Sequence, residues 1–166
     1  MKLPLEIATT KDALQIASLL SETARHLTSV YGEGHWTHQS TEKGVLFGMR
    51  GNAKVLVARQ DNVIAGTLRL TTKKPWAIDT AYFTRVNQPV YLVDMAVKTD
   101  LQRTGIGSYM LQQVTPFAKA WPAQSVRLDA YDAPAGAGEF YRKCGYREMA
   151  HVVYKGTPLI YYELML

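Results

Sequence analysis

The sequence has very little cysteine: Cys144 is the only one among its 166 residues. An intrachain disulfide needs two cysteines and a cysteine-rich metal site needs more, so both are excluded. A single thiol favours a reducing compartment, and we therefore expect the protein in the cytoplasm. Long hydrophobic runs are missing too, because no stretch approaches the ~20 apolar residues of a membrane span. Residues 1–6 are not apolar enough for a signal peptide, so we expect neither feature.

Basic residues are only in mild excess. The chain has 19 Lys and Arg against 14 Asp and Glu, which gives a net charge of +5. The basic residues are scattered and form no stripe with interleaved aromatic residues, which disfavours a nucleic-acid-binding domain. A polyanionic ligand explains the same excess equally well. Hydrophobic residues make up 47%, as in ordinary globular proteins, and the length predicts one domain over residues 1–166.

Hydrophobic periodicity divides the chain into helices and strands. Apolar residues at helical spacing predict helices over residues 10–27, 41–49, 105–120 and 138–143. Apolar runs bounded by turn residues predict strands over residues 6–8, 54–59, 63–73, 90–97, 125–130, 146–154 and 159–166. Pro116 should kink the third helix, because it cannot donate to the carbonyl of Gln112. The order predicts an α/β domain with two helices on each face of a mixed sheet.

The strand at residues 90–97 leads into a glycine-containing loop with the pattern Gln-x-x-Gly-x-Gly, from Gln102 to Gly107. Its two glycines lack the Cβ atoms that would keep a phosphate from the main chain. The first N–H groups of the helix that follows have no intrahelical partner and attract an anion. A P-loop would need a Gly-Lys pair, and a dinucleotide fingerprint would need glycine in place of Met110. The loop therefore predicts a pyrophosphate site, although such loops also serve as simple turns.

This loop resembles the acyl-CoA signature of the GNAT superfamily of N-acyltransferases. A second motif, Ala-Gly-Glu-Phe-Tyr-Arg-Lys-Cys-Gly-Tyr at residues 137–146, resembles the family's helix-four signature. The resemblance covers nearly the whole chain and is weakest at residues 29–50 and 74–89. It implies the GNAT fold, an α/β fold whose mixed central sheet of about seven strands splays between strands 4 and 5, with about four helices. One departure is Pro134, which stands where many members have an Asn that bonds the pantetheine arm.

The resemblance implies an enzyme that transfers an acetyl group from acetyl-CoA, its co-substrate, to a primary amine by direct attack. An acyl-CoA-binding sensor without activity is the alternative on the same fold. The expected partners are acetyl-CoA and an amine acceptor, with neither nucleic acid nor membrane, while a homodimer stays open. By motif position, the cofactor contacts are Met95, Ala96, Val97, Gln102, Arg103, Thr104, Gly105, Ile106, Gly107, Ser108 and Tyr141.

Two catalytic roles follow from the same resemblance. The N–H of Met95 would polarise the thioester carbonyl, and the hydroxyl of Tyr141 would protonate the leaving thiolate. Tyr141 could instead be a core aromatic residue, as we interpret its neighbour Phe140. Direct attack needs no covalent intermediate, so Cys144 is expected to be a small buried residue rather than a nucleophile.

The base that removes a proton from the amine is less determined. Asp94 is the one charged residue in a strand that we expect to be buried on both faces, which favours it as the base. Strand alternation, however, groups it with Leu92 and Ala96, away from Met95, and this favours a structural role. The loop carboxylates of Glu33 and Asp132 are further candidates.

In this family the acceptor pocket is usually built by the loop between the first two helices and by the connection before the fourth strand. Here these segments are rich in aromatic residues, and we expect Trp36, Trp76 and Tyr82 to contact the acceptor. Aromatic walls suit an apolar or cationic acceptor, unless the rings only cover the core. A small amine, a peptide N-terminus and a lysine stay open as acceptors. His35 and His38 lack a third ligand, so no metal site is expected.

Overall fold

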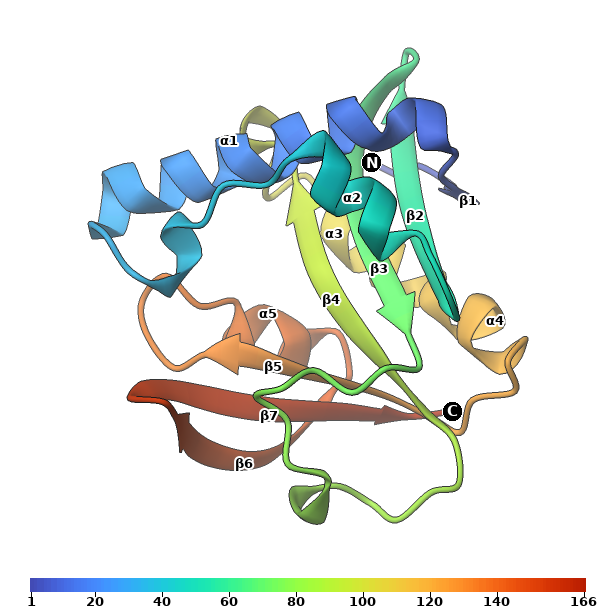
Figure 1. The fold of residues 1–166 in the computed structure, drawn as a ribbon, viewed down its shortest axis with the longest axis vertical. Helices are drawn as coiled ribbons and strands as arrows, with labels where there is room; N and C mark the ends of the chain where they lie inside the picture. Colours follow the sequence, from blue (N-terminus) through green and yellow to red (C-terminus); the bar gives the residue numbers. More distant parts are fainter.

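The computed structural model describes residues 1–166, and its strands form one seven-stranded sheet in the order β1-β2-β3-β4-β5-β7-β6 (Figure 1). All neighbours are antiparallel except β4 and β5, which run parallel. The mixed sheet predicted from the sequence is therefore confirmed. The strands are β1 (Leu5–Ile7), β2 (Ala53–Gln60), β3 (Val63–Thr71), β4 (Pro89–Val97), β5 (Ser125–Tyr131), β6 (Arg147–Tyr154) and β7 (Thr157–Met165).

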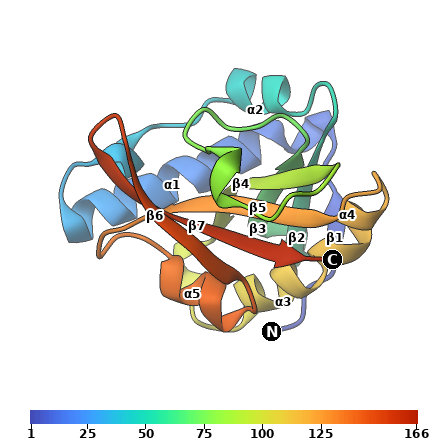
Figure 2. The ribbon, with the colours of Figure 1, turned by 90° about the horizontal axis from the view of Figure 1, so that it is seen from below.

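Helices cover both faces of the sheet (Figure 2). One face carries α1 (Ala13–Tyr31) and α2 (Glu42–Gly48). The other carries α3 (Ile106–Gln112), α4 (Val114–Lys119) and α5 (Gly138–Lys143). Single turns of 3-10 helix lie between them, namely η1 (Thr10–Asp12), η2 (His35–Thr37), η3 (Thr80–Tyr82) and η4 (Thr99–Leu101). None of the helices combines the length and apolar character needed to cross a bilayer.

The expected third helix is split at Gln113 into α3 and α4, which changes the predicted two helices on this face into three. Pro116 has no N–H to donate to the carbonyl of Gln112, and its ring crowds that carbonyl. The helix is interrupted by one residue at Gln113, close to the expected kink, and Gln113 itself keeps helical backbone angles. Helix α1 also differs from the prediction, since it continues to Tyr31 rather than ending near Leu27.

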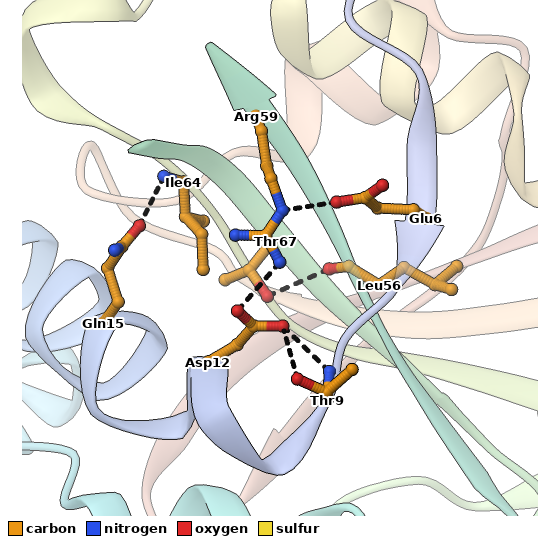
Figure 3. Close-up of polar contacts among 8 residues, drawn as sticks. All are labelled: Glu6, Thr9, Asp12, Gln15, Leu56, Arg59, Ile64 and Thr67. Carbon is orange, nitrogen blue, oxygen red and sulfur yellow. Dashed lines mark hydrogen bonds and ion pairs between the residues drawn. The ribbon is translucent and has the colours of Figure 1, made fainter. Parts of the chain in front are cut away.

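The start of α1 is fixed by polar contacts with the first two strands (Figure 3). The carboxylate of Asp12 accepts from the N–H of Thr9 at 2.8 Å and pairs with Arg59 of β2 at 2.8 Å. Arg59 also pairs with Glu6 of β1. Burial raises the pKa of Asp12, but the hydrogen bonds from Arg59 and Thr9 outweigh burial and leave it below its ordinary value. Thr9 and Asp12, rather than the predicted Thr10, therefore cap this end of the helix.

Strand β4 contains a β-bulge opposite β3. Thr67 pairs with Ala96 and Arg69 with Val93, so two residues of β4 face one residue of β3. Asp94 lies in this bulge with φ of +53°, a conformation that aspartate tolerates better than most residues. Its side chain is 55% exposed, so the expectation that both faces of this strand are buried is wrong for its second half.

The bulge also changes which side chains share a face. Met95 and Val97 pack on the core cluster beneath α3 and α5, whereas Ala96 packs with residues of α1 on the opposite face. Val93 pairs with Arg69 on the α1 side. Leu92 also packs on the core cluster, so the predicted grouping of Asp94 with Leu92 is wrong, because simple alternation does not hold across the extra residue.

Strands β4 and β5 are paired over only three residues each, ending at Tyr91 and Arg127. Beyond this pair the two strands diverge, as Figure 1 shows. Arg127 is anchored there by a buried ion pair with Glu163 of β7 at 3.0 Å and by a bond to the carbonyl of Thr84 at 2.6 Å. The expected splay between strands 4 and 5 is confirmed.

Candidate active site

The fork between β4 and β5 leaves main-chain groups of β4 without a strand partner. The N–H of Lys98 donates to the carbonyl of Ala65 on β3 at 2.8 Å. Because successive residues alternate, the N–H of Val97 points away from β3 into the fork. The carbonyl of Val97 also faces this side, where it accepts from the side chain of Gln102 at 3.1 Å. The fork can therefore receive an extended chain that carries amide groups.

The glycine loop lies at the end of this fork and presents its backbone. Gly105 has φ of +90°, which favours glycine, and an added Cβ would have no closer neighbour than the N-terminus of Met1 at 3.5 Å. The N–H groups of Ile106, Gly107 and Ser108 have no acceptor within the chain, as expected of a first helical turn. Three free N–H groups beside a Cβ-free turn fit a pyrophosphate.

Gly107 has a second, structural role. An added Cβ would lie 3.2 Å from the ring of Phe140, so this glycine lets α3 approach α5 closely. A β-branched residue at Gly107 would disturb this packing as well as any bound phosphate.

Tyr141 lies on α5 and reaches the fork from the other face of the sheet. Its ring is 8% exposed and packs edge-on against Tyr146, with the centroids 5.8 Å apart. Its hydroxyl contacts the sulfur of Met95 at 3.9 Å. Burial is the main cause that raises the pKa of this hydroxyl, and the charges of Asp129 and Cys144 raise it further. Tyr141 therefore stays protonated and can act only as a proton donor near the β4 bulge.

Asp129 is a site residue that the sequence analysis missed. It lies on β5 two residues beyond Arg127, where pairing with β4 ends, and opposite Tyr161 of β7. Its carboxylate has neither a cation nor a side-chain donor beside it. Burial raises its pKa, and a bond from its own backbone offsets this only in part. The sequence signal was the one acidic residue of β5, at the alternate positions that also carry Arg127 and Tyr131.

The carboxylates proposed from the sequence lie elsewhere. Asp94 lines the α1 side of β4 and is bound through Oδ2 to Arg69, with both N–O distances at 3.2 Å. Asp132 accepts from Nδ1 of His151 at 3.0 Å on the surface, and Glu33 is an exposed loop residue. Only Asp129 combines partial burial, a raised pKa and a position in the fork.

The structure separates the three aromatic residues expected around the acceptor. Trp76 is 84% exposed and lines a cavity of about 700 Å³ between α2, the β2–β3 hairpin and β4. Trp36 instead packs edge-on against Tyr131, with the centroids 5.7 Å apart. Tyr82, in the connection before β4, packs edge-on against Tyr161, with the ring centroids 5.9 Å apart.

Two further positions bear on cofactor binding. Pro134 is exposed in the turn after β5, as the sequence motif indicated. In the same turn an added Cβ at Gly136 would lie 1.8 Å from the carbonyl of Tyr131, so only glycine fits there.

Cys144 ends α5 as a half-buried thiol whose pKa is raised by burial. A raised pKa disfavours the thiolate, in agreement with a packing role.

Comparisons with known proteins agree on the family and the fold. A model of the acetyltransferase (GNAT) family matches residues 16–146. No curated protein gives a significant match. Among solved structures, a Streptococcus mutans protein is 20% identical with a TM-score of 0.75, covering 98% of this chain and 99% of that one.

Two named acetyltransferases have the same architecture. An N-acetyltransferase of Staphylococcus aureus is 16% identical with a TM-score of 0.72, and 99% of each chain is covered. The PaiA N-acetyltransferase of Thermoplasma acidophilum, solved in complex with coenzyme A, is 14% identical with a TM-score of 0.74, and 100% of each chain is covered. At these identities the likeness shows the shared fold.

Proposed function

The chain belongs to the acetyltransferase (GNAT) family, and on this premise we propose that it transfers the acetyl group of acetyl-CoA to a primary amine. The observation that carries the proposal is the junction of three features at one place. A strand fork with a free main-chain N–H, a glycine loop with three free N–H groups, and the buried hydroxyl of Tyr141 meet at the end of β4, where the loop lies against Val97 and the hydroxyl against Met95. The lone free thiol of Cys144 supports the cytoplasm as its location.

The chain's backbone is suited to hold the cofactor. Residues 105–108 would bind the pyrophosphate, and the exposed guanidinium of Arg103 would add positive charge beside it. The free N–H of Val97 would bond an amide carbonyl of the pantetheine arm in the fork. When bound, acetyl-CoA supplies a thioester whose C–S bond breaks as the C–N bond to the amine forms.

The residues around the fork have separate roles in this proposal. The N–H of Met95 stabilises the negative charge that develops on the acyl oxygen. Tyr141 donates its hydroxyl proton to the departing sulfur, for which its raised pKa keeps it in the protonated form. Asp129 accepts the proton that the acceptor's ammonium must lose, directly or through a water. Its raised pKa makes it a better base than an ordinary exposed carboxylate.

A thiol-release assay with acetyl-CoA and a panel of amines tests the proposal, with Tyr141→Phe as the diagnostic variant. The ring packing against Tyr146 is kept and only the donor is lost, so the melting temperature should stay constant. Turnover should fall by roughly 10²-fold, and calorimetry should show unchanged acetyl-CoA affinity.

Other results of these measurements would show which part of the proposal is wrong. Wild-type turnover in Tyr141→Phe would exclude it as the acid. Acetyl-CoA binding without thiol release for any amine would identify a sensor module instead of an enzyme, and no binding would contradict the cofactor site itself.

A further inference from the structure

The cavity beside β4 is lined in part by residues of α1 and α2. These two helices cover one face of the sheet (Figures 1 and 2). Its volume of about 700 Å³ suits a small-molecule ligand. Its inner wall includes Val93 and Asp94, which directly precede Met95 of the fork. A ligand in this cavity therefore reaches the strand at which acyl transfer is proposed.

The charge of the cavity wall is strongly one-sided. Four of its lining residues are basic, and Asp94 is its only carboxylate. The basic residues are Arg50, Arg69, Lys73 and Lys74. Arg69 is the only one of them that pairs with a carboxylate. The remaining three leave an uncompensated positive charge in the wall.

Two of these cations, Arg50 and Lys73, are carried by neighbouring segments of the cavity wall. The N–H of Thr72 donates to the carbonyl of Asn52 at 3.2 Å, which joins the segments that carry Lys73 and Arg50. Neither side chain has a carboxylate partner, and both are exposed. Lys74 is fixed beside them, since its ammonium donates to the carbonyls of Pro75 and Ile78 at 2.9 and 2.7 Å. Both acceptors are neutral carbonyls, so no carboxylate pairs with this ammonium.

The β4 side of the cavity wall instead carries a negatively charged acceptor. Arg69 contacts Asp94 only through Oδ2, and Oδ1 has no partner. This free carboxylate oxygen is the one acceptor with negative charge in the wall, and it lies one residue from Met95. An ammonium or amine group is therefore attracted to the β4 side of the cavity, and an anion to the side that carries Arg50, Lys73 and Lys74.

We propose that the acceptor is a small primary amine that carries a carboxylate or a phosphate at its other end. The anion is bound by Arg50, Lys73 and Lys74, and the amine is directed by Asp94 toward the fork. This assignment rests on the proposed acetyl transfer and adds the substrate class. A polyamine or another polycation would place like charges against Arg50, Lys73 and Lys74 and is disfavoured. Of the three aromatic residues expected around the acceptor, only Trp76 lines the cavity. Phe47 also lines it, but the guanidinium of Arg50 lies over its ring at 5.9 Å from the centroid.

Thiol release with amines of equal length but different terminal charge tests this assignment. The series is γ-aminobutyrate, its primary amide and putrescine, together with ethanolamine and its phosphate ester. The anionic member of each set should have a KM roughly tenfold or more below its neutral or cationic counterparts, and this advantage should shrink at high salt. Comparison of the carboxylate with the phosphate ester distinguishes the two anions.

A double variant, Arg50→Gln with Lys73→Gln, should raise the KM of the preferred anionic amine by roughly 3–10-fold, as expected for two partly exposed ion pairs. The matched control Lys119→Gln removes an exposed lysine of α4 outside the cavity and should change nothing. Equal or better use of putrescine by the wild type would overturn the substrate class while leaving acetyl transfer intact.

Calorimetry separates the two proposals if no amine releases thiol. Binding of an anionic amine that weakens in the double variant but not in the control would support the cavity assignment and contradict the transferase function. Absence of such binding would overturn the cavity assignment.

Discussion

At the scale of single residues, Asp129 links stability to activity. Burial holds its pKa above the ordinary value of 3.8, so the folded chain binds its proton more tightly than the unfolded chain. The resulting stabilisation is fully present below about pH 3.8 and is lost as the pH rises through the higher folded value. Asp129→Asn removes the charge, so this loss should disappear and the variant should gain stability relative to wild type toward neutral pH.

The same substitution should lower turnover by roughly 10²-fold or more, because the base is lost. Melting temperatures between pH 4 and 7 and a pH–rate profile measure both effects, and Asp61→Asn in the β2–β3 turn is the control. In the wild type, activity should decline in acid as Asp129 becomes protonated. A variant with normal turnover at every pH would exclude Asp129 as the base.

The site residues that could be predicted from the sequence are those that belong to contiguous motifs. Gly105 and Tyr141 belong to contiguous motifs, and the structure puts both at the fork. Asp129 has no motif, since its environment depends on where β4 leaves β5 and on the packing of Tyr161 beside it. Such long-range geometry has no signature in a single strand.

Among the helices and strands, most could be predicted from hydrophobic periodicity. The predictions were wrong where strand pairing determines the backbone conformation. The bulge at Asp94 is set by the register between β3 and β4, so the period of β4 alone could not reveal it. The break at Gln113 was foreseen because Pro116 acts locally.

The buried pair of Arg127 and Glu163 joins β5, β7 and the connection before β4. Arg127 donates to Glu163 and to the carbonyl of Thr84, and Glu163 accepts from the N–H of Thr84 at 3.2 Å. Glu163→Gln should leave the guanidinium buried without its counter-charge and cost about 3–5 kcal/mol of unfolding free energy. Urea denaturation measures this loss.

Glu6→Gln is the matched control, since Glu6 pairs with Arg59 at the surface with its side chain 56% exposed. It should cost no more than about 1 kcal/mol. Equal losses in the two variants would show that burial does not govern the strength of the Arg127 pair.

In the molecule as a whole, the two faces of the sheet carry different parts of the proposed site. The face beneath α3 and α5 brings Tyr141 and the glycine loop to the fork, and the face beneath α1 and α2 carries the cavity. Both meet at the β4 bulge, where Asp94 points to the cavity side and Met95 to the side of Tyr141. Cofactor binding and acceptor binding should therefore respond to different substitutions.

Trp76 and Trp36 provide a test of this division, because both lie in segments that were expected to contact the acceptor. Trp76 lines the cavity and is 84% exposed, so Trp76→Ala should raise the acceptor's KM by roughly fivefold and leave the melting temperature and acetyl-CoA affinity unchanged. Trp36 donates to the carbonyl of Gly32 at 3.0 Å and packs on Tyr131 outside the cavity. Trp36→Ala should cost about 1 kcal/mol of stability without changing the acceptor's KM. Melting curves and two-substrate kinetics on both variants measure these effects, and an acceptor KM that rises only in Trp36→Ala would place the acceptor near Tyr131 instead of in the cavity.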